Sequence, residues 1–207
     1  KAQAKKNIVA HYDLGNDFYA LWLDESMTYS SALFEPGFGQ ALPAAQTAKY
    51  DRALRELQLR PGAHILEIGC GWGGFAEHAA RQGFRITCLT LSPSQLEYAQ
   101  KRIERAGLTD NVHFFLRDYR DHITQVDGIV SIEMYEAVGE RYWGKYFRAI
   151  HDALKPGARA CIQGITIDHK RFAQYKRTSD FIQQYIFPGG MLASPEIITE
   201  HANKSQL

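Results

Sequence analysis

Short apolar runs alternate with longer amphipathic segments through most of the 207-residue chain. Unbroken apolar runs between polar or glycine-rich breaks are typical of buried parallel strands, whereas apolar residues spaced three and four apart predict helices. Strands are predicted at residues 63–69, 84–92, 111–118, 126–133 and 158–167. Helices are predicted at residues 44–59, 74–82, 93–107 and 141–155, the last closed by Lys-Pro-Gly. This alternation predicts an α/β fold whose parallel sheet carries helices on both faces.

A glycine-rich turn follows the first predicted strand. Gly69, Gly71 and Gly74 have the G-x-G-x-x-G spacing of a dinucleotide-binding turn, which alone is a weak signal. A P-loop is excluded because no Gly-Lys-Ser/Thr follows. A dinucleotide needs an acid for its ribose at the end of the second strand, and residues 84–92 end without one.

An acid stands instead before the turn, at Glu67. A carboxylate at this point would repel a pyrophosphate and suits a cationic ligand. S-adenosylmethionine is such a ligand, since it carries an ammonium and a sulfonium and no phosphate. The alternative is a tight turn whose glycines only allow the helix and the strand to pack. Asp118, at the end of the third strand, is either an acceptor for an adenine amino group or an exposed turn acid.

Composition narrows the class of protein further. The net charge of +1 gives no basic field for nucleic acid. No apolar run reaches the roughly 20 residues of a membrane span, and the first residues lack a signal-peptide core. The three cysteines, Cys70, Cys88 and Cys161, fit reduced thiols of a cytoplasmic protein. No Cys or His pair has zinc spacing, so we expect no metal.

Five stretches carry a family resemblance. They are "HYDLGNDFYALWLDESMTYSSALFEPG", "LEIGCGWGGFAEHAA", "LTLSPSQLEYA", "SIEMYEAVGERYW" and "SDFIQQYIFPGGMLAS". In this order they resemble the cyclopropane fatty acid synthase family, also called cyclopropane-fatty-acyl-phospholipid synthases, and within it a subgroup of plant and some bacterial enzymes. The resemblance implies a class I methyltransferase with a Rossmann-like, doubly wound sheet of order 3-2-1-4-5. It also implies methyl transfer from S-adenosylmethionine to the double bond of an unsaturated, phospholipid-linked acyl chain.

The resemblance also implies a site. In the family a bound bicarbonate is thought to be the base, anchored by a Glu that matches Glu136. Many relatives have Cys where this chain has Ser31, and His where it has Gln163. Ser and Gln can each hydrogen-bond an anion, and these three residues form the predicted catalytic set. Glu133 is left outside that set as a surface acid, although it would share a face with Glu136 if the segment were helical.

The predicted cofactor residues come mainly from the same resemblance. Tyr29 and Ser30 are expected near the methionine end, the glycine turn under the ligand, and the end of the second strand near the ribose. The full set is Tyr29, Ser30, Glu67, Gly69, Gly71, Thr90, Leu91, Gln95, Asp118, Tyr119 and Ile132.

Methyl transfer to an alkene leaves a carbocation, so the site must be dry, with aromatic walls and one positioned anion. Aromatic residues for such walls are Tyr12, Phe18, Tyr19, Trp22, Tyr135, Tyr142 and Trp143. Most of these, taken singly, fit core packing better.

Three parts are expected: a helical cap over residues 1–60, a cofactor-binding core over 61–167, and a helical substrate-side segment over 168–207. A set of basic residues fits an ordinary solvated helix face best, with approach to a phospholipid surface at the inner face of the membrane as the alternative. They are Lys1, Lys5, Lys6, Lys170, Arg171, Lys176 and Arg177.

The resemblance further implies two more strands and an active-site Tyr beyond the fifth strand, which this sequence lacks. We therefore expect a homo-oligomer through the open edge, or cover from residues 181–207, and weak or no turnover. Three rival functions remain: a transfer that leaves a methyl branch, a small-molecule N-methyltransferase, and a domain that binds the cofactor without turnover.

Overall fold

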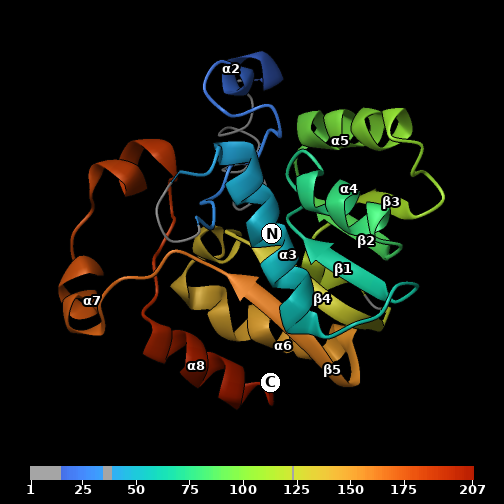
Figure 1. The fold of residues 1–207 in the computed structure, drawn as a ribbon. Helices are drawn as coiled ribbons and strands as arrows, with labels where there is room; N and C mark the ends of the chain where they lie inside the picture. Colours follow the sequence, from blue (N-terminus) through green and yellow to red (C-terminus); the bar gives the residue numbers. More distant parts are fainter. Residues whose placement is uncertain (1–14, 35–38, 123) are drawn as a thin grey trace.

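The computed structural model describes residues 15–34, 39–122 and 124–207 (Figure 1). Tyr12, Lys1, Lys5 and Lys6 lie outside these residues. The five strands are β1 (His64–Ile68), β2 (Arg85–Thr90), β3 (Val112–Leu116), β4 (Val126–Ile132) and β5 (Leu154–Gln163). They form one parallel sheet in the order β3-β2-β1-β4-β5, which confirms the predicted topology.

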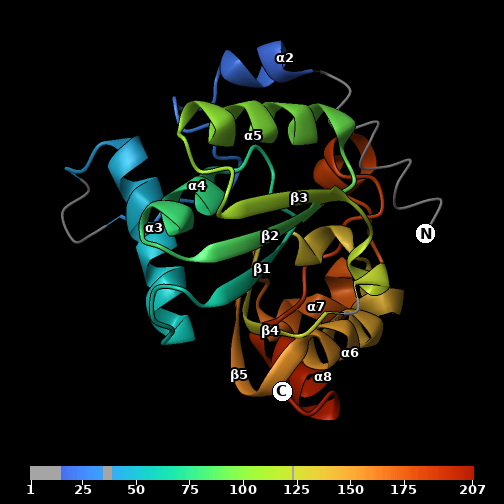
Figure 2. The same cartoon turned by 90° about the vertical axis from the view of Figure 1, so that its right-hand side faces the viewer.

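Helices cover both faces of this sheet (Figure 2). The larger helices are α3 (Leu42–Leu57), α4 (Gly74–Arg81), α5 (Pro93–Arg105), α6 (Trp143–Ala153) and α8 (Pro195–Lys204). Because side chains of a strand alternate between faces, Ile65 packs in the core under α3 and α4, and Leu66 packs in the core under α6. Ser92 caps α5 by accepting a hydrogen bond from the Gln95 N–H.

The fifth strand differs from its predicted bounds. It begins at Leu154, so the Lys-Pro-Gly expected to close a helix lies within its irregular start, where the register against β4 shifts. It ends at Gln163 and not at Ile167, because the next backbone leaves the ladder and the Ile165 N–H donates to the Glu136 carboxylate. Further along, Thr166 forms an isolated bridge with Ala193.

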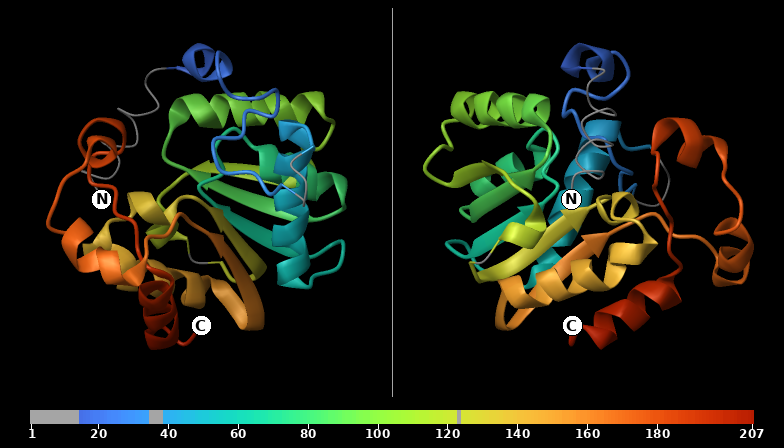
Figure 3. Two further views of the ribbon diagram at one scale, coloured as in Figure 1. Left: turned by 60° about the vertical axis from the view of Figure 1, so that its left-hand side comes forward. Right: turned by 180° about the vertical axis from the view of Figure 1, so that it is seen from behind.

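Short elements complete the described chain. They are α2 (Asn16–Ala20), η1 (Tyr119–Asp121), η2 (Tyr135–Ala137), η3 (Glu140–Tyr142), α7 (His169–Tyr175) and the π-helix η4 (Ile182–Ile186). The arc that carries α7 and η4 stands away from the sheet (Figures 1 and 3). It meets the N-terminal segment where the rings of Phe187 and Tyr29 stack with centroids 6.1 Å apart. The division into three parts remains a prediction.

Within the ranges described, no helix is both long and apolar enough to cross a bilayer.

Candidate active site at the carboxyl edge of the sheet

The glycine turn after β1 combines open space with close packing. Gly69 and Gly71 both have left-handed backbones, with φ of 82° and 51°. A Cβ at Gly71 would meet no atom within 4 Å, so the surface there is free for a ligand. A Cβ at Gly74 would lie 2.7 Å from the Tyr50 hydroxyl, so this third glycine lets α4 pack against α3. The packing reading therefore accounts for Gly74 but not for Gly71.

Glu67 lies inside the protein and not in the open turn. Its side chain is 4% exposed, and the Cys88 thiol of β2 donates to its Oε2 at 3.5 Å. Burial raises the pKa of Glu67 to about 8, while the Cys88 hydrogen bond and the charge of Arg102 act in the opposite direction. That Glu67 favours a cationic ligand remains a prediction.

The ends of the next two strands hold the residues predicted for ribose and adenine. Buried Thr90 donates from Oγ1 to Gln95 Oε1 at 3.4 Å, while Leu91 is partly buried. Asp118 accepts from the Arg120 N–H at 3.0 Å and pairs with the Arg120 guanidinium. These contacts fit the reading of Asp118 as a turn acid. The prediction that it accepts a hydrogen bond from an adenine amino group remains a prediction. Burial raises the pKa of neighbouring Tyr119 to about 12.

Two of the three predicted catalytic residues come together at the ends of β4 and β5. Gln163 Nε2 donates to Ser31 Oγ at 3.0 Å, although 132 positions separate the two residues. Both also donate to Glu133: the Ser31 N–H and Oγ lie 2.8 Å from its Oε1, and Gln163 Nε2 lies 3.1 Å from it. Glu133, expected to be a plain surface acid, is thus the acceptor at the centre of this cluster.

Glu136 lies three residues further along the chain, and within the described ranges no hydrogen bond joins its side chain to Ser31 or Gln163. The segment is not one helical turn, because Glu133 has a left-handed φ of 46° and only Tyr135–Ala137 is helical. Oε1 of Glu136 accepts from the Ile165 N–H. Oε2 is buried with no hydrogen-bond partner among the described residues. Burial raises the pKa of Glu136, and the Ile165 hydrogen bond opposes that rise.

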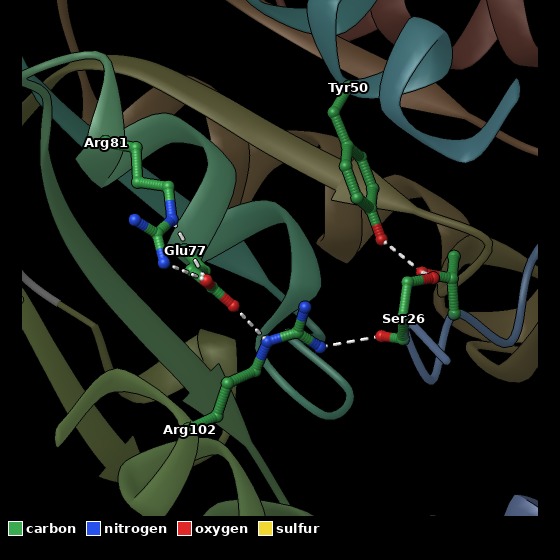
Figure 4. Close-up of polar contacts among 6 residues, drawn as sticks. Ser26, Tyr50, Glu77, Arg81 and Arg102 are labelled. Atoms are coloured by element: carbon green, nitrogen blue, oxygen red, sulfur yellow. Dashed lines mark hydrogen bonds and ion pairs between the residues drawn. The ribbon is translucent and has the colours of Figure 1, made fainter. Parts of the chain in front are cut away.

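Ionic and hydroxyl contacts fix the N-terminal segment that carries Tyr29, Ser30 and Ser31 (Figure 4). Arg102 of α5 is held by Glu77 and donates to the Ser26 carbonyl oxygen at 2.6 Å. Two residues further on, the Thr28 hydroxyl lies 2.8 Å from the Tyr50 hydroxyl of α3. Sequence reasoning missed this network, since it joins four separate parts of the chain.

A buried cation on α3 also holds the N-terminal segment in place by hydrogen bonds. Lys49 of α3 is 5% exposed and donates from Nζ to Ser30 Oγ at 2.5 Å and to Gln46 Oε1 at 2.6 Å. Gln46 Nε2 donates to the Ser30 carbonyl oxygen at 2.9 Å. Burial lowers the pKa of Lys49 to about 8, and the charge of Glu133 opposes this change. Burial and the same Glu133 charge raise the pKa of Tyr29.

The predicted aromatic walls fall into two groups. Tyr19, Tyr135 and Trp143 are fully buried in core clusters, as the packing alternative expected. Phe18 and Trp22 are exposed beside them, and the Trp22 ring meets Tyr29 at 5.1 Å. Ile132, the last residue of β4, is partly buried against the core. In the described ranges, no group of three or more His, Cys, Asp or Glu side chains could hold a metal.

The sheet order β3-β2-β1-β4-β5, with a glycine turn after β1, is the fold of the class I S-adenosylmethionine-dependent methyltransferases. Solved structures of that class superpose on the chain, including coclaurine N-methyltransferase bound to N-methylheliamine and SAH (TM-score 0.76, 22% identity, 92% of this chain and 56% of that one). At this identity the likeness shows the fold alone.

The family follows from closer comparisons. The sequence model of the mycolic acid cyclopropane synthetase family matches residues 1–207, and the chain belongs to that family. It is 45% identical to tuberculostearic acid methyltransferase of Mycobacterium tuberculosis over 96% of this chain and 48% of that protein. It is 37% identical to cyclopropane-fatty-acyl-phospholipid synthase of Escherichia coli over 92% of this chain and 47% of that protein. The chain thus spans about half the length of these curated relatives.

A solved relative also covers most of the chain. It is a mycolic acid cyclopropane synthase crystallised with SAH and CTAB, with a TM-score of 0.89 and 33% identity over 97% of this chain and 74% of that one. The family expected from the five sequence stretches is confirmed.

Proposed function

We propose that the protein transfers the methyl group of S-adenosylmethionine to the double bond of an unsaturated, phospholipid-linked acyl chain and closes a cyclopropane ring. The observation that carries this proposal is the meeting of Ser31, Gln163 and Glu133 beside the glycine turn. This cluster places an anion where the ends of β1 and β4 adjoin, which is the topological switch point of such a sheet. Family membership supports the class of reaction.

The cofactor supplies an electrophilic methyl group when bound. We propose that the open surface at Gly71 takes its body and that Tyr29 and Ser30 hold its methionine end. The segment that carries them is already fixed by Lys49, Gln46 and the Arg102 network, so little ordering is left for binding. Thr90, Leu91, Gln95, Asp118 and Tyr119 follow as the ribose and adenine residues, and Glu67, Gly69 and Ile132 as the floor.

Bicarbonate fits this arrangement poorly. The buried Oε2 of Glu136 would accept a hydrogen bond from its hydroxyl group. However, the other two expected ligands, Ser31 and Gln163, already donate to the carboxylate of Glu133. An external anion would have to displace that side chain, so we assign no step to bicarbonate.

A methyl-branched product is the second candidate. The relatives include tuberculostearic acid methyltransferase at 45% identity and a probable fatty acid methyltransferase of Pseudomonas putida at 39%, beside the cyclopropane synthase at 37%. The first two names specify no ring, so ring closure is not the only outcome that the family supports. Glu136, close to Glu133 in either case, keeps its proposed place at the reacting centre.

We further propose a cytoplasmic protein that approaches the inner face of a membrane. Exposed basic residues on and after α7 are followed along the chain by the exposed aromatic residues Phe181 and Tyr185 of the η4 region. Each basic residue near an anionic surface contributes about 1 kcal/mol. Among the described residues β5 pairs only with β4, so its free edge is the place where a homo-oligomer would form.

Two measurements test the proposal. Calorimetry is expected to show binding of S-adenosylhomocysteine and none of NADH, and the reverse would overturn the cofactor assignment. Mass spectrometry of lipids from cells that express the chain is expected to show acyl chains with one CH2 added and no remaining alkene. The same gain with the alkene kept or moved would establish the branch, and no gain with cofactor bound would establish a binding domain.

A further inference from the structure

We infer that the carboxylate of Glu133 is the proton-accepting base of this chain and takes the position that bicarbonate holds in the family. The inference rests on the proposed function and deepens it, because it changes the identity of the base. It removes the need for an external anion and makes Glu133, which sequence reasoning set aside, a catalytic residue.

The first support is the hydrogen bonding of one oxygen. Oε1 of Glu133 accepts from the Ser31 N–H and Oγ at 2.8 Å and from Gln163 Nε2 at 3.1 Å. Ser31 and Gln163 are the residues expected to bind an external anion, and they come from two different segments of the chain. Three donors that converge on one oxygen are a typical way to hold an anion in place. The anion that they hold belongs to the protein.

The second support is the backbone that aims the side chain. Glu133 has a φ of 46°, in the left-handed region that costs a residue with a side chain about 1–2 kcal/mol. Its own N–H donates to the Gln163 carbonyl oxygen at 2.9 Å, so the strained turn is fixed to the end of β5. Strained residues of this kind gather at functional sites. The same φ means that glycine is accommodated here without strain.

Charged and titratable groups from each neighbouring segment surround Glu133. The charge of Glu133 raises the pKa of Tyr29 in the N-terminal segment and of Glu136 after β4, and it opposes the lowering of the pKa of Lys49 on α3. The buried ammonium of Lys49 balances the carboxylate. Ser31 is exposed and Glu133 partly exposed, so the carboxylate can be reached by a substrate.

The step balances without any further reactant. Methyl transfer breaks the bond from carbon to sulfur, forms a carbon–carbon bond and leaves a thioether and a carbocation on the acyl chain. Glu133 then accepts a proton from the new methyl group, and the electron pair of that C–H bond closes the ring onto the cation. A proton beside a carbocation is strongly acidic, so a carboxylate suffices. The protonated Glu133 returns its proton to water.

Binding of formate tests the occupied anion position without requiring turnover. Isotope-labelled formate is titrated by NMR into wild type, Glu133→Gly and Glu133→Gln. The glycine variant frees the donors of Ser31 and Gln163, so saturable binding is expected there. The amide oxygen of Gln still accepts from both donors, so Glu133→Gln and wild type are expected not to bind. Equal binding by wild type and Glu133→Gly, or no binding by any of the three, would overturn the inference.

Turnover tests the role of base in the same three proteins. Both variants are expected to lose at least about 10²-fold in methyl transfer, the usual size of a general-base effect. Added bicarbonate or formate is expected to restore Glu133→Gly and to leave wild type and Glu133→Gln unchanged. A wild type that responds to bicarbonate, or a fully active Glu133→Gln, would refute the base. Failure of wild type to bind S-adenosylhomocysteine would instead refute the proposed function. The formate titration would still decide whether the Glu133 carboxylate or an external anion occupies the anion position.

Discussion

Replacing Glu67 by Gln should change how the stability of the protein depends on pH. Glu67 is 4% exposed, and its carboxyl group receives a hydrogen bond from the Cys88 thiol at 3.5 Å. Burial raises its pKa to about 8 from an ordinary value of 4.5. Between these two values the folded protein keeps a proton on Glu67 that the unfolded chain has released.

The size of the effect follows from the distance between the two pKa values. Because the folded state binds more protons, the free energy of unfolding falls as pH rises, by about 1.4 kcal/mol for each pH unit. The fall begins above the unfolded value and ends near pH 8, where the folded protein also ionises, with a total on the order of 5 kcal/mol. Gln cannot ionise and keeps nearly the same shape. The stability of Glu67→Gln relative to wild type should therefore increase over this window.

The assay is denaturant unfolding of wild type and Glu67→Gln at several pH values from 5 to 9. Glu97→Gln is the matched control, because Glu97 is exposed on α5 and pairs with Lys101 at 2.6 Å. The control should follow wild type across this range. A difference between Glu67→Gln and wild type that stays constant with pH would show that Glu67 is ionised in the folded protein, and the burial argument would fail.

Three further outcomes are expected. Gly71→Val should abolish binding of S-adenosylhomocysteine, whereas Gly107→Val should leave it intact. Both glycines have a positive φ and open space around them, but only Gly71 faces the predicted cofactor. Equal loss of binding in calorimetry would contradict this prediction. Gln163→His should add an ionisation between about pH 6 and 8 to the rate profile, and superimposed profiles would place Gln163 outside the reacting centre. Arg102→Met should lower the free energy of unfolding by about 1.5–3 kcal/mol and weaken cofactor binding. Arg81→Met, which breaks a more exposed pair with Glu77, should cost no more than about 1 kcal/mol; equal costs would refute the role of Arg102 in holding Ser26.

A parallel sheet could be predicted from the sequence because β1, β2 and β4 are largely buried and read as apolar runs, while the order of the strands followed from the family resemblance. The fifth strand was misplaced at both ends for two different reasons. Its start contains Pro156 and Gly157, which resemble a helix stop, yet the bulge against β4 accommodates them. Its end is set by Glu136, whose carboxylate takes the Ile165 N–H out of the ladder. That contact spans 29 positions, and a local pattern cannot reveal it.

The candidate site was predicted in its parts but not in its connections. Family resemblance placed Ser31 and Gln163 at one site, and the structure joins them directly. Glu133 was not included in the predicted site because its sequence context, at the end of an apolar strand, is that of a surface acid. Only a left-handed φ turns its carboxylate toward Ser31, and nothing in the sequence marks a glutamate for that conformation.

The position of Glu133 also explains why Ser31 and Gln163 are suitable neighbours. Ser and Gln are neutral donors, so they satisfy a carboxylate without adding a charge of their own. A histidine in place of Gln163 would bring a group that titrates near neutral pH into contact with the Glu133 side chain. Here the balancing charge comes from Lys49, which is buried on α3 and holds Ser30 in place. The two departures from the family pattern and the internal carboxylate therefore form one arrangement, in which a fixed anion is held by neutral donors and balanced by a single buried cation on the neighbouring helix.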